Sequence, residues 1–100
     1  MRKRALLEKS ISLITGNRED DYGDVHKNFS DIAAGWSMVF HHRVEPWQVA
    51  ACMVIVKLAR LIKTPEHIDS WADAGVYIGI GAELATESTM EVSPTDKDDA

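Results

Sequence analysis

Two groups of charged side chains stand at spacings that could support chemistry. The stretch "KLAR" places Lys57 and Arg60 three residues apart, and "DSWADAGVY" places Asp69, Asp73 and Tyr77 at intervals of four. Residues spaced in this way share one face of an α-helix. The two cations can hold a phosphate or carboxylate, Arg60 through its bidentate guanidinium. Alternatively, they stabilise the end of a helix, where positive charge is favourable.

The two aspartates need a positive partner, because like charges four residues apart destabilise a helix. Asp69 and Asp73 therefore pair with Lys57 and Arg60 across a helix contact, or they bind a divalent cation such as Mg²⁺. The same segment carries Gly75 and Gly79 in a seam of small residues, which predicts a close approach by another helix.

A third feature is the acidic stretch "TGNREDDYGDVHKNF", Thr15 to Phe29. It is a solvated turn that ends in Asp24 as a helix cap, or it is a binding loop. In the second interpretation Arg18 and Tyr22 form one wall of a pocket for an anionic ligand. The candidate metal ligands across the chain are Asp21, Asp24, Asp69 and Asp73.

The helical periodicity of the sequence predicts the elements that carry these groups. It predicts four helices, at about 3–15, from Asp24 to "HHRVE", from Pro46 to about Ile62, and from Pro65 to about Thr86. The fold class is therefore all-α, a compact four-helix bundle. The third helix is apolar nearly all round, which places it in the middle of the domain or between subunits. Within it, Cys52 is expected to be a small core residue.

The bulk composition limits the class of protein. A chain of 100 residues with 45% hydrophobic content forms one domain, residues 1–87, and the acidic, Ser/Thr-rich remainder, 88–100, is predicted to be disordered. A net charge of −5 argues against direct nucleic-acid binding. The longest apolar run has eight residues, too short to span a bilayer, so we expect a cytoplasmic protein without a membrane partner.

The motifs "DDYGD", "KLAR" and "HIDSWADAGVY" resemble a family of short proteins of unknown function that bacteriophages and prophages encode. The resemblance covers about Ile14 to Leu84. These proteins are distantly similar to the MazG-type all-α nucleoside triphosphate pyrophosphohydrolases, which oligomerise and hold Mg²⁺ with E-x-x-E and E-x-x-D sets. This chain has no E-x-x-E; "DYGD" supplies a D-x-x-D, and Glu66 and Asp69 form an E-x-x-D.

Three functions remain open from the sequence. The first is binding of a nucleotide or other phosphorylated small molecule by a phage homo-oligomer, which would sequester a host defence signal in the bacterial cytoplasm without hydrolysing it. The second is a Mg²⁺-dependent pyrophosphohydrolase, and the third is a structural or protein-partner role. No residue is assigned a catalytic role. The expected ligand-binding residues are Arg18, Tyr22, Lys57, Arg60, Asp69, Asp73 and Tyr77.

Overall fold

The computed structural model describes residues 1–16 and 24–90, and within these residues the chain is all-α. Four helices are present in the described part: α1 (Lys3–Thr15), α3 (Val25–Phe40), α4 (Pro46–Lys63) and α5 (Ile68–Met90). The predicted fold class is thus confirmed. The helices α1, α3 and α4 lie within a residue or two of their expected positions. None of the described helices is both long and apolar enough to cross a membrane.

Local signals explain where α3 and α4 begin. The Asp24 carboxylate accepts hydrogen bonds from the backbone N–H groups of His26 (2.9 Å) and Lys27 (3.3 Å), which satisfies the free donors of the first turn of α3. Glu45 and Gln48 form a reciprocal capping box at the start of α4, and Pro46 occupies the first helical position.

The start of α5 differs from the prediction. The helix begins at Ile68, not at Pro65, and residues 64–67 form the connection from α4. His67 takes the capping position, with Nδ1 3.3 Å from the Ser70 backbone nitrogen, which donates to it. The Trp71 indole N–H donates to the Pro65 carbonyl at 2.8 Å, which holds Pro65 in the connection. At its other end α5 continues to Met90, past the expected Thr86.

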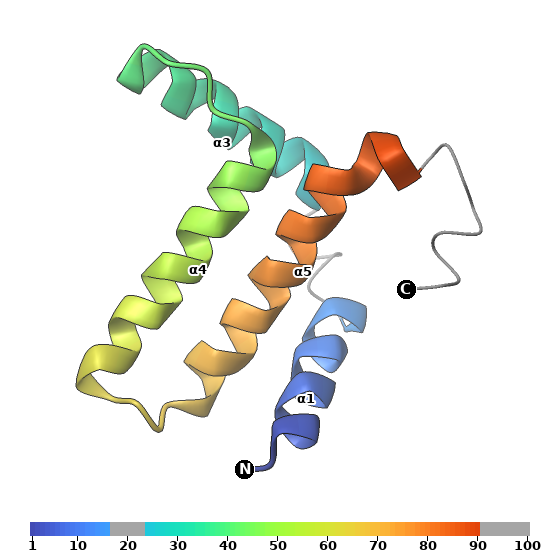
Figure 1. The fold of residues 1–100 in the computed structure, drawn as a ribbon, viewed down its shortest axis with the longest axis vertical. Coiled ribbons are helices and arrows are strands. Elements are labelled where there is room, and N and C mark those ends of the chain that lie inside the picture. The colour runs from blue at the N-terminus through green and yellow to red at the C-terminus, as the bar shows by residue number, and fades with distance from the viewer. Residues whose placement is uncertain (17–23, 91–100) are drawn as a thin grey trace.

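Three of the helices lie side by side, in the order α4, α5, α1, and α3 crosses at one end of this layer (Figure 1). The helices α1 and α5 run in the same direction, whereas α4 runs opposite to both. The most extensive contact joins α4 to α5. Phe29 and Ala33 of α3 pack with Val49 and Ala50 of α4 to form the main core cluster.

The core of a single chain is small. Eight hydrophobic side chains of the described residues are buried, and four of these are alanines: Phe29, Ala33, Val49, Ala50, Leu61, Ala72, Ala74 and Val76. Cys52, expected in the core, is exposed, so that expectation was wrong. Its helix is apolar on several faces, but part of that apolar surface, including Cys52, is not covered by the described part of the chain.

Candidate functional site

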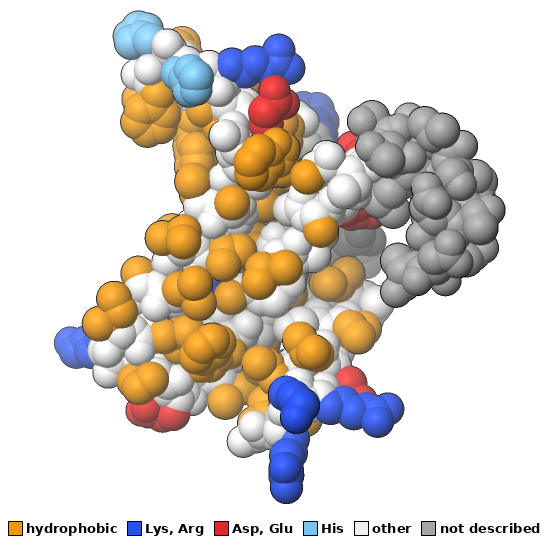
Figure 2. Space-filling view, in the orientation of Figure 1, with side chains coloured by type: hydrophobic (Ala, Val, Ile, Leu, Met, Phe, Trp, Pro, Cys, Tyr) orange, Lys and Arg blue, Asp and Glu red, His pale blue; other side chains and the backbone are white. Residues whose placement is uncertain are grey.

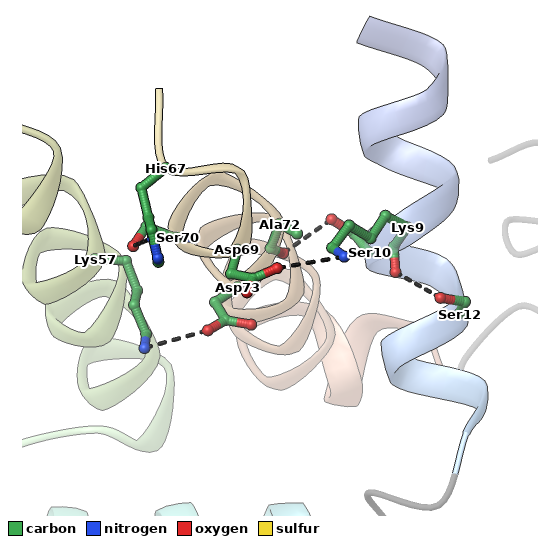
Figure 3. Close-up of polar contacts among 9 residues, drawn as sticks. All are labelled: Lys9, Ser10, Ser12, Lys57, His67, Asp69, Ser70, Ala72 and Asp73. Carbon is green, nitrogen blue, oxygen red and sulfur yellow. Dashed lines mark hydrogen bonds and ion pairs between the residues drawn. The ribbon is translucent and has the colours of Figure 1, made fainter. Parts of the chain in front are cut away.

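Lys57 and Asp73 form a largely buried ion pair between α4 and α5 (Figure 3). The Lys57 Nζ lies 3.2 Å from an Asp73 carboxylate oxygen, and the two side chains are only 16% and 18% exposed. Burying two charges costs several kcal/mol each in desolvation, and the opposite charges of Lys57 and Asp73 offset part of this cost. The ion-pair interpretation of these two residues is confirmed.

Asp69 and Arg60 have different surroundings. The Asp69 carboxylate lies 3.3 Å from Nζ of Lys9, so the cation that faces it comes from α1 (Figure 3). Arg60 is exposed in the last turn of α4, where positive charge favours the helix terminus. The four charged residues predicted as one group thus separate into a buried α4–α5 contact, an exposed α1–α5 contact and a surface cation.

Tyr77 belongs to an aromatic pair. Its ring stacks on Phe29 with centroids 6.3 Å apart and an angle of 26° between the planes. Phe29 is in the core, whereas Tyr77 is partly buried and packs against the core cluster. Such offset pairs contribute about 0.5–1.5 kcal/mol beyond the area that they bury. The pair joins α3 to α5 and forms part of the wall of a cleft.

This cleft lies among α1, α3 and α5, has a volume of about 750 Å³, and is lined mainly by apolar side chains. Two of its lining residues flank residues 17–23 in the sequence: Ile14 precedes this segment and Asp24 follows it. Asp21, Arg18 and Tyr22, three of the predicted site residues, lie outside the described residues. The full lining is Leu13, Ile14, Asp24, Val25, His26, Asn28, Phe29, Ile32, Met53, Val76, Tyr77, Ile80 and Glu83.

Polar groups gather around one histidine of the cleft. The His26 Nε2 lies 3.2 Å from a Glu83 carboxylate oxygen, and Nδ1 lies 3.3 Å from a Glu87 oxygen. The hydrogen bond to Glu83 raises the pKa of His26 above its ordinary value of 6.5; partial burial opposes this, and the charges of Glu87, Glu83 and Asp24 add to it. Protonated His26 therefore links the start of α3 to the end of α5.

Sequence reasoning missed His26, Glu83 and Glu87. A signal for the last two was present, because they are carboxylates four residues apart on one helix and so require a cation opposite them. Nothing local indicates that this cation is His26, which is 57 residues from Glu83.

Three of the four predicted magnesium ligands, Asp24, Asp69 and Asp73, lie in the described residues and do not form one cluster there. Asp69 and Asp73 face Lys9 and Lys57, and Asp24 caps α3 beside the cleft that Glu83 also lines. The helical rise of about 1.5 Å per residue separates Asp69 from Glu83 by roughly 20 Å along α5. Among the residues described, no group of three or more His, Cys, Asp or Glu side chains is arranged to hold a metal ion. Asp21 lies outside the described residues, so the magnesium site stays a prediction, and we derive no step through the ion.

Comparison with known proteins adds a family and two relatives. The model of a family described as "Domain of unknown function (DUF6378)" matches residues 5–85. The chain is 34% identical to the Gene 55 protein of Mycobacterium phage D29 over 90% of its length, and 33% identical to the Gene 55 protein of Mycobacterium phage L5 over 76%. It spans 59% and 49% of those two proteins. No solved structure matches this chain.

Proposed function

This chain belongs to the DUF6378 family, and we propose that it binds a nucleotide or a related phosphorylated small molecule in the cleft among α1, α3 and α5. The observation that carries the proposal is the cleft itself, with an apolar lining, a stacked Phe29–Tyr77 pair and a few polar groups around His26. Small-molecule sites have this character, and their volumes are typically about 300–1,000 Å³.

The apolar part of the cleft suits a base. Ile80 and Val76 of α5 and Ile32 of α3 offer aliphatic surface next to the aromatic pair. A planar base gains about 1–3 kcal/mol by stacking on an aromatic side chain, whatever its identity. Asn28 adds an amide that can donate to and accept from the polar edge of a base.

We assign the phosphate end to Arg18, which the sequence predicts as a ligand-binding residue together with Tyr22. Ile14 and Asp24, which flank residues 17–23 in the sequence, line the cleft. A guanidinium binds phosphate through two parallel hydrogen bonds. Lys57 follows Met53 by one helical turn and adds positive charge near the cleft, although Asp73 already compensates it. Arg60 is a weaker candidate for the phosphate because its position at the end of α4 is two turns from Met53.

The origin of the relatives suggests a use for such binding. Both are phage proteins, and a phage benefits from removing a phosphorylated signal that activates host defence. In this proposal the chain acts in the cytoplasm of the infected bacterium and holds its ligand intact. A magnesium-dependent pyrophosphohydrolase of MazG type is the second candidate, favoured by the carboxylates of Asp24 and Glu83 in the cleft lining.

The direct test incubates the purified chain with a panel of nucleotides, with and without Mg²⁺, and recovers bound molecules after denaturation. Recovery of an intact nucleotide supports the proposal. Release of pyrophosphate supports the hydrolase, and the absence of binding to every member of the panel contradicts both.

A matched pair of variants locates the site. Ile14 and Ile11 are exposed on the same helix, but only Ile14 lines the cleft. We expect I14W to fill the cleft and weaken binding at least about tenfold, or roughly 1.4 kcal/mol, while I11W binds like wild type. Equal affinity of I14W and wild type would place the ligand elsewhere. R18A should weaken binding of a phosphorylated ligand more than that of the matching nucleoside.

A further inference from the structure

One face of the α4–α5 pair carries apolar side chains that nothing in the described chain covers. On α4 the exposed residues Trp47, Ile55 and Ile62 follow at intervals of seven or eight, so they lie in one stripe along the helix. Ile55 is 63% exposed and Ile62 is 87% exposed. On α5 the exposed residues Trp71 and Ile78 form a second stripe by the same spacing. We call the two stripes together the α4–α5 face.

Charged groups are turned away from this face. Lys57 and Asp73 point toward each other in the helix contact, and Glu83 and Glu87 point toward His26 of α3. Asp69 pairs with Lys9 on the side of α1. Figure 2 accordingly shows hydrophobic side chains along the helices on the side turned to the viewer, with charged ones at the ends and margins.

The α4–α5 face has a groove, and the large side chains beside this groove form a ridge. A shallow groove of about 480 Å³ runs between the helices, with small residues Ala51, Gly81, Ala82 and Ala85 in its lining and Trp47, Ile55 and Ile78 beside them. The helices approach closely here, because a Cβ added to Gly81 would lie 3.2 Å from the Cβ of Ala50. Side-chain ridges of one helix pair pack into grooves of this kind on another.

The dimensions suit a stable contact. With 18 residues, α4 is about 27 Å long, and two adjacent helices are roughly 20 Å wide. A standard protein interface buries about 800 Å² on each partner and is enriched in Trp at its centre. Monomeric proteins rarely expose contiguous apolar patches of more than a few hundred Å².

We propose that a second copy of this chain covers the α4–α5 face, so that α4 and α5 of two chains form a four-helix core around a two-fold axis. The small core of one chain favours this occupant, because domains are stable when two layers enclose apolar surface, and in the described chain α3 crosses the layer of α4, α5 and α1 at one end only. A second copy is present wherever the protein is made. The ridge and the groove occur on the same face, as a two-fold contact requires.

Charge supports the same occupant. Two chains that each carry a net charge of −5 repel at long range, and they associate most favourably through a face whose described side chains carry no charge. The proposed dimer does not depend on the proposed ligand, which would bind in the cleft among α1, α3 and α5.

The test measures the mass of the full chain by sedimentation velocity from about 1 to 100 μM, the range of ordinary protein affinities. We expect a dimer. I55E places a charge on the α4–α5 face and should raise the dimer dissociation constant about 30-fold or more. V56E is the control, because Val56 is an exposed neighbour outside the two stripes, and its dissociation constant should stay within about threefold of wild type.

Several outcomes would overturn the proposal. A wild-type monomer at every concentration refutes the dimer, and a monomer that instead sediments with lipid vesicles assigns the face to a membrane surface. A dimer that survives I55E places the contact on another face. Should I55E be unfolded by circular dichroism, I55A and V56A give the same comparison with intact helices, and equal dissociation constants for those two contradict the assignment.

Discussion

Ser10 of α1 packs directly against Gly75 of α5. The Ser10 hydroxyl donates a buried hydrogen bond of 2.9 Å to the Ala72 carbonyl, and a Cβ on Gly75 would lie only 2.6 Å from that hydroxyl oxygen. A side chain at position 75 is thus incompatible with Ser10 where it stands. The glycine allows α1 to approach α5 closely enough to form one side of the cleft.

The first prediction compares two glycines of α5. G75A forces Ser10 away from Ala72 and should lower the free energy of unfolding by about 1–3 kcal/mol. G79A is the control, because its added Cβ would meet only the end of Ile14 at 4.0 Å, and it should raise stability by about 0.5–1 kcal/mol. Urea unfolding at one fixed protein concentration measures both. A loss of the same size in both variants would show that the space at Gly75 is unimportant.

The second prediction concerns the coupling of Ser10 and Gly75. S10A removes a buried hydrogen bond and should cost about 1 kcal/mol. Because S10A also removes the oxygen that the new Cβ would meet, the cost of G75A should be smaller in the S10A background than in wild type. A double-mutant cycle measures this difference, and additive costs would contradict the contact.

The third prediction concerns the buried ion pair. K57M removes the ammonium group that lies 3.2 Å from the largely buried Asp73 carboxylate, so we expect a loss of about 3 kcal/mol. K9M removes the cation from the more exposed pair with Asp69 and should cost less than about 1 kcal/mol. Chemical denaturation compares the two, and equal losses would show that burial does not distinguish these pairs.

The fourth prediction is a pH dependence. The folded-state pKa of His26 is raised above its ordinary value of 6.5, so the pairing of His26 with Glu83 and Glu87 stabilises the protein fully below pH 6.5. This stability is lost as the pH rises through the higher folded-state value. The negative charge of Asp24 also raises the pKa of His26.

The measurement is the stability difference between wild type and H26Q at about pH 5.5 and pH 8.5, on either side of that window. The difference should be larger at the lower pH, by about 0.2–1 kcal/mol, the usual scale for partly exposed pairs. H42Q is the control, because His42 is exposed in the connection between α3 and α4. A difference that grows toward high pH would contradict the sign.

The fifth prediction concerns Cys52. Because the thiol is exposed, a disulfide reagent should label one thiol per chain in the native protein without denaturant. C52S should not react. Labelling of wild type only after unfolding would show that another copy or another part of the chain covers this side of α4.

The features predicted from sequence have local causes. Asp24 caps α3 because its carboxylate reaches donors two and three residues away, and Pro46 begins α4 because its fixed φ suits the first helical turn. Pro65 satisfied the same rule, but α5 begins only at Ile68. The Trp71 indole bonds to the Pro65 carbonyl and keeps that residue in the connection, an interaction that a helix-start pattern does not encode.

The site was less predictable because its contacts are distant in sequence. Lys9 pairs with Asp69 and His26 pairs with Glu83, and each pair joins two different helices. The hydrophobic periodicity of the sequence predicts helices but not how they are placed relative to one another. The ion pair of Lys57 and Asp73 was predicted because the two residues lie on consecutive helices and each needs an opposite charge. Cys52 was misassigned because an all-round apolar helix does not reveal which of its faces has a partner within the chain.

The attachment of α1 has a consequence for folding. The short connection between α4 and α5 lets this hairpin form early, whereas the Ser10–Ala72 hydrogen bond closes a sequence separation of 62 residues and carries a larger entropic cost. We therefore expect α1 to dock last and to open first in native-state hydrogen exchange. A ligand in the cleft would then slow the exchange of α1 amides before it affects the α4–α5 hairpin.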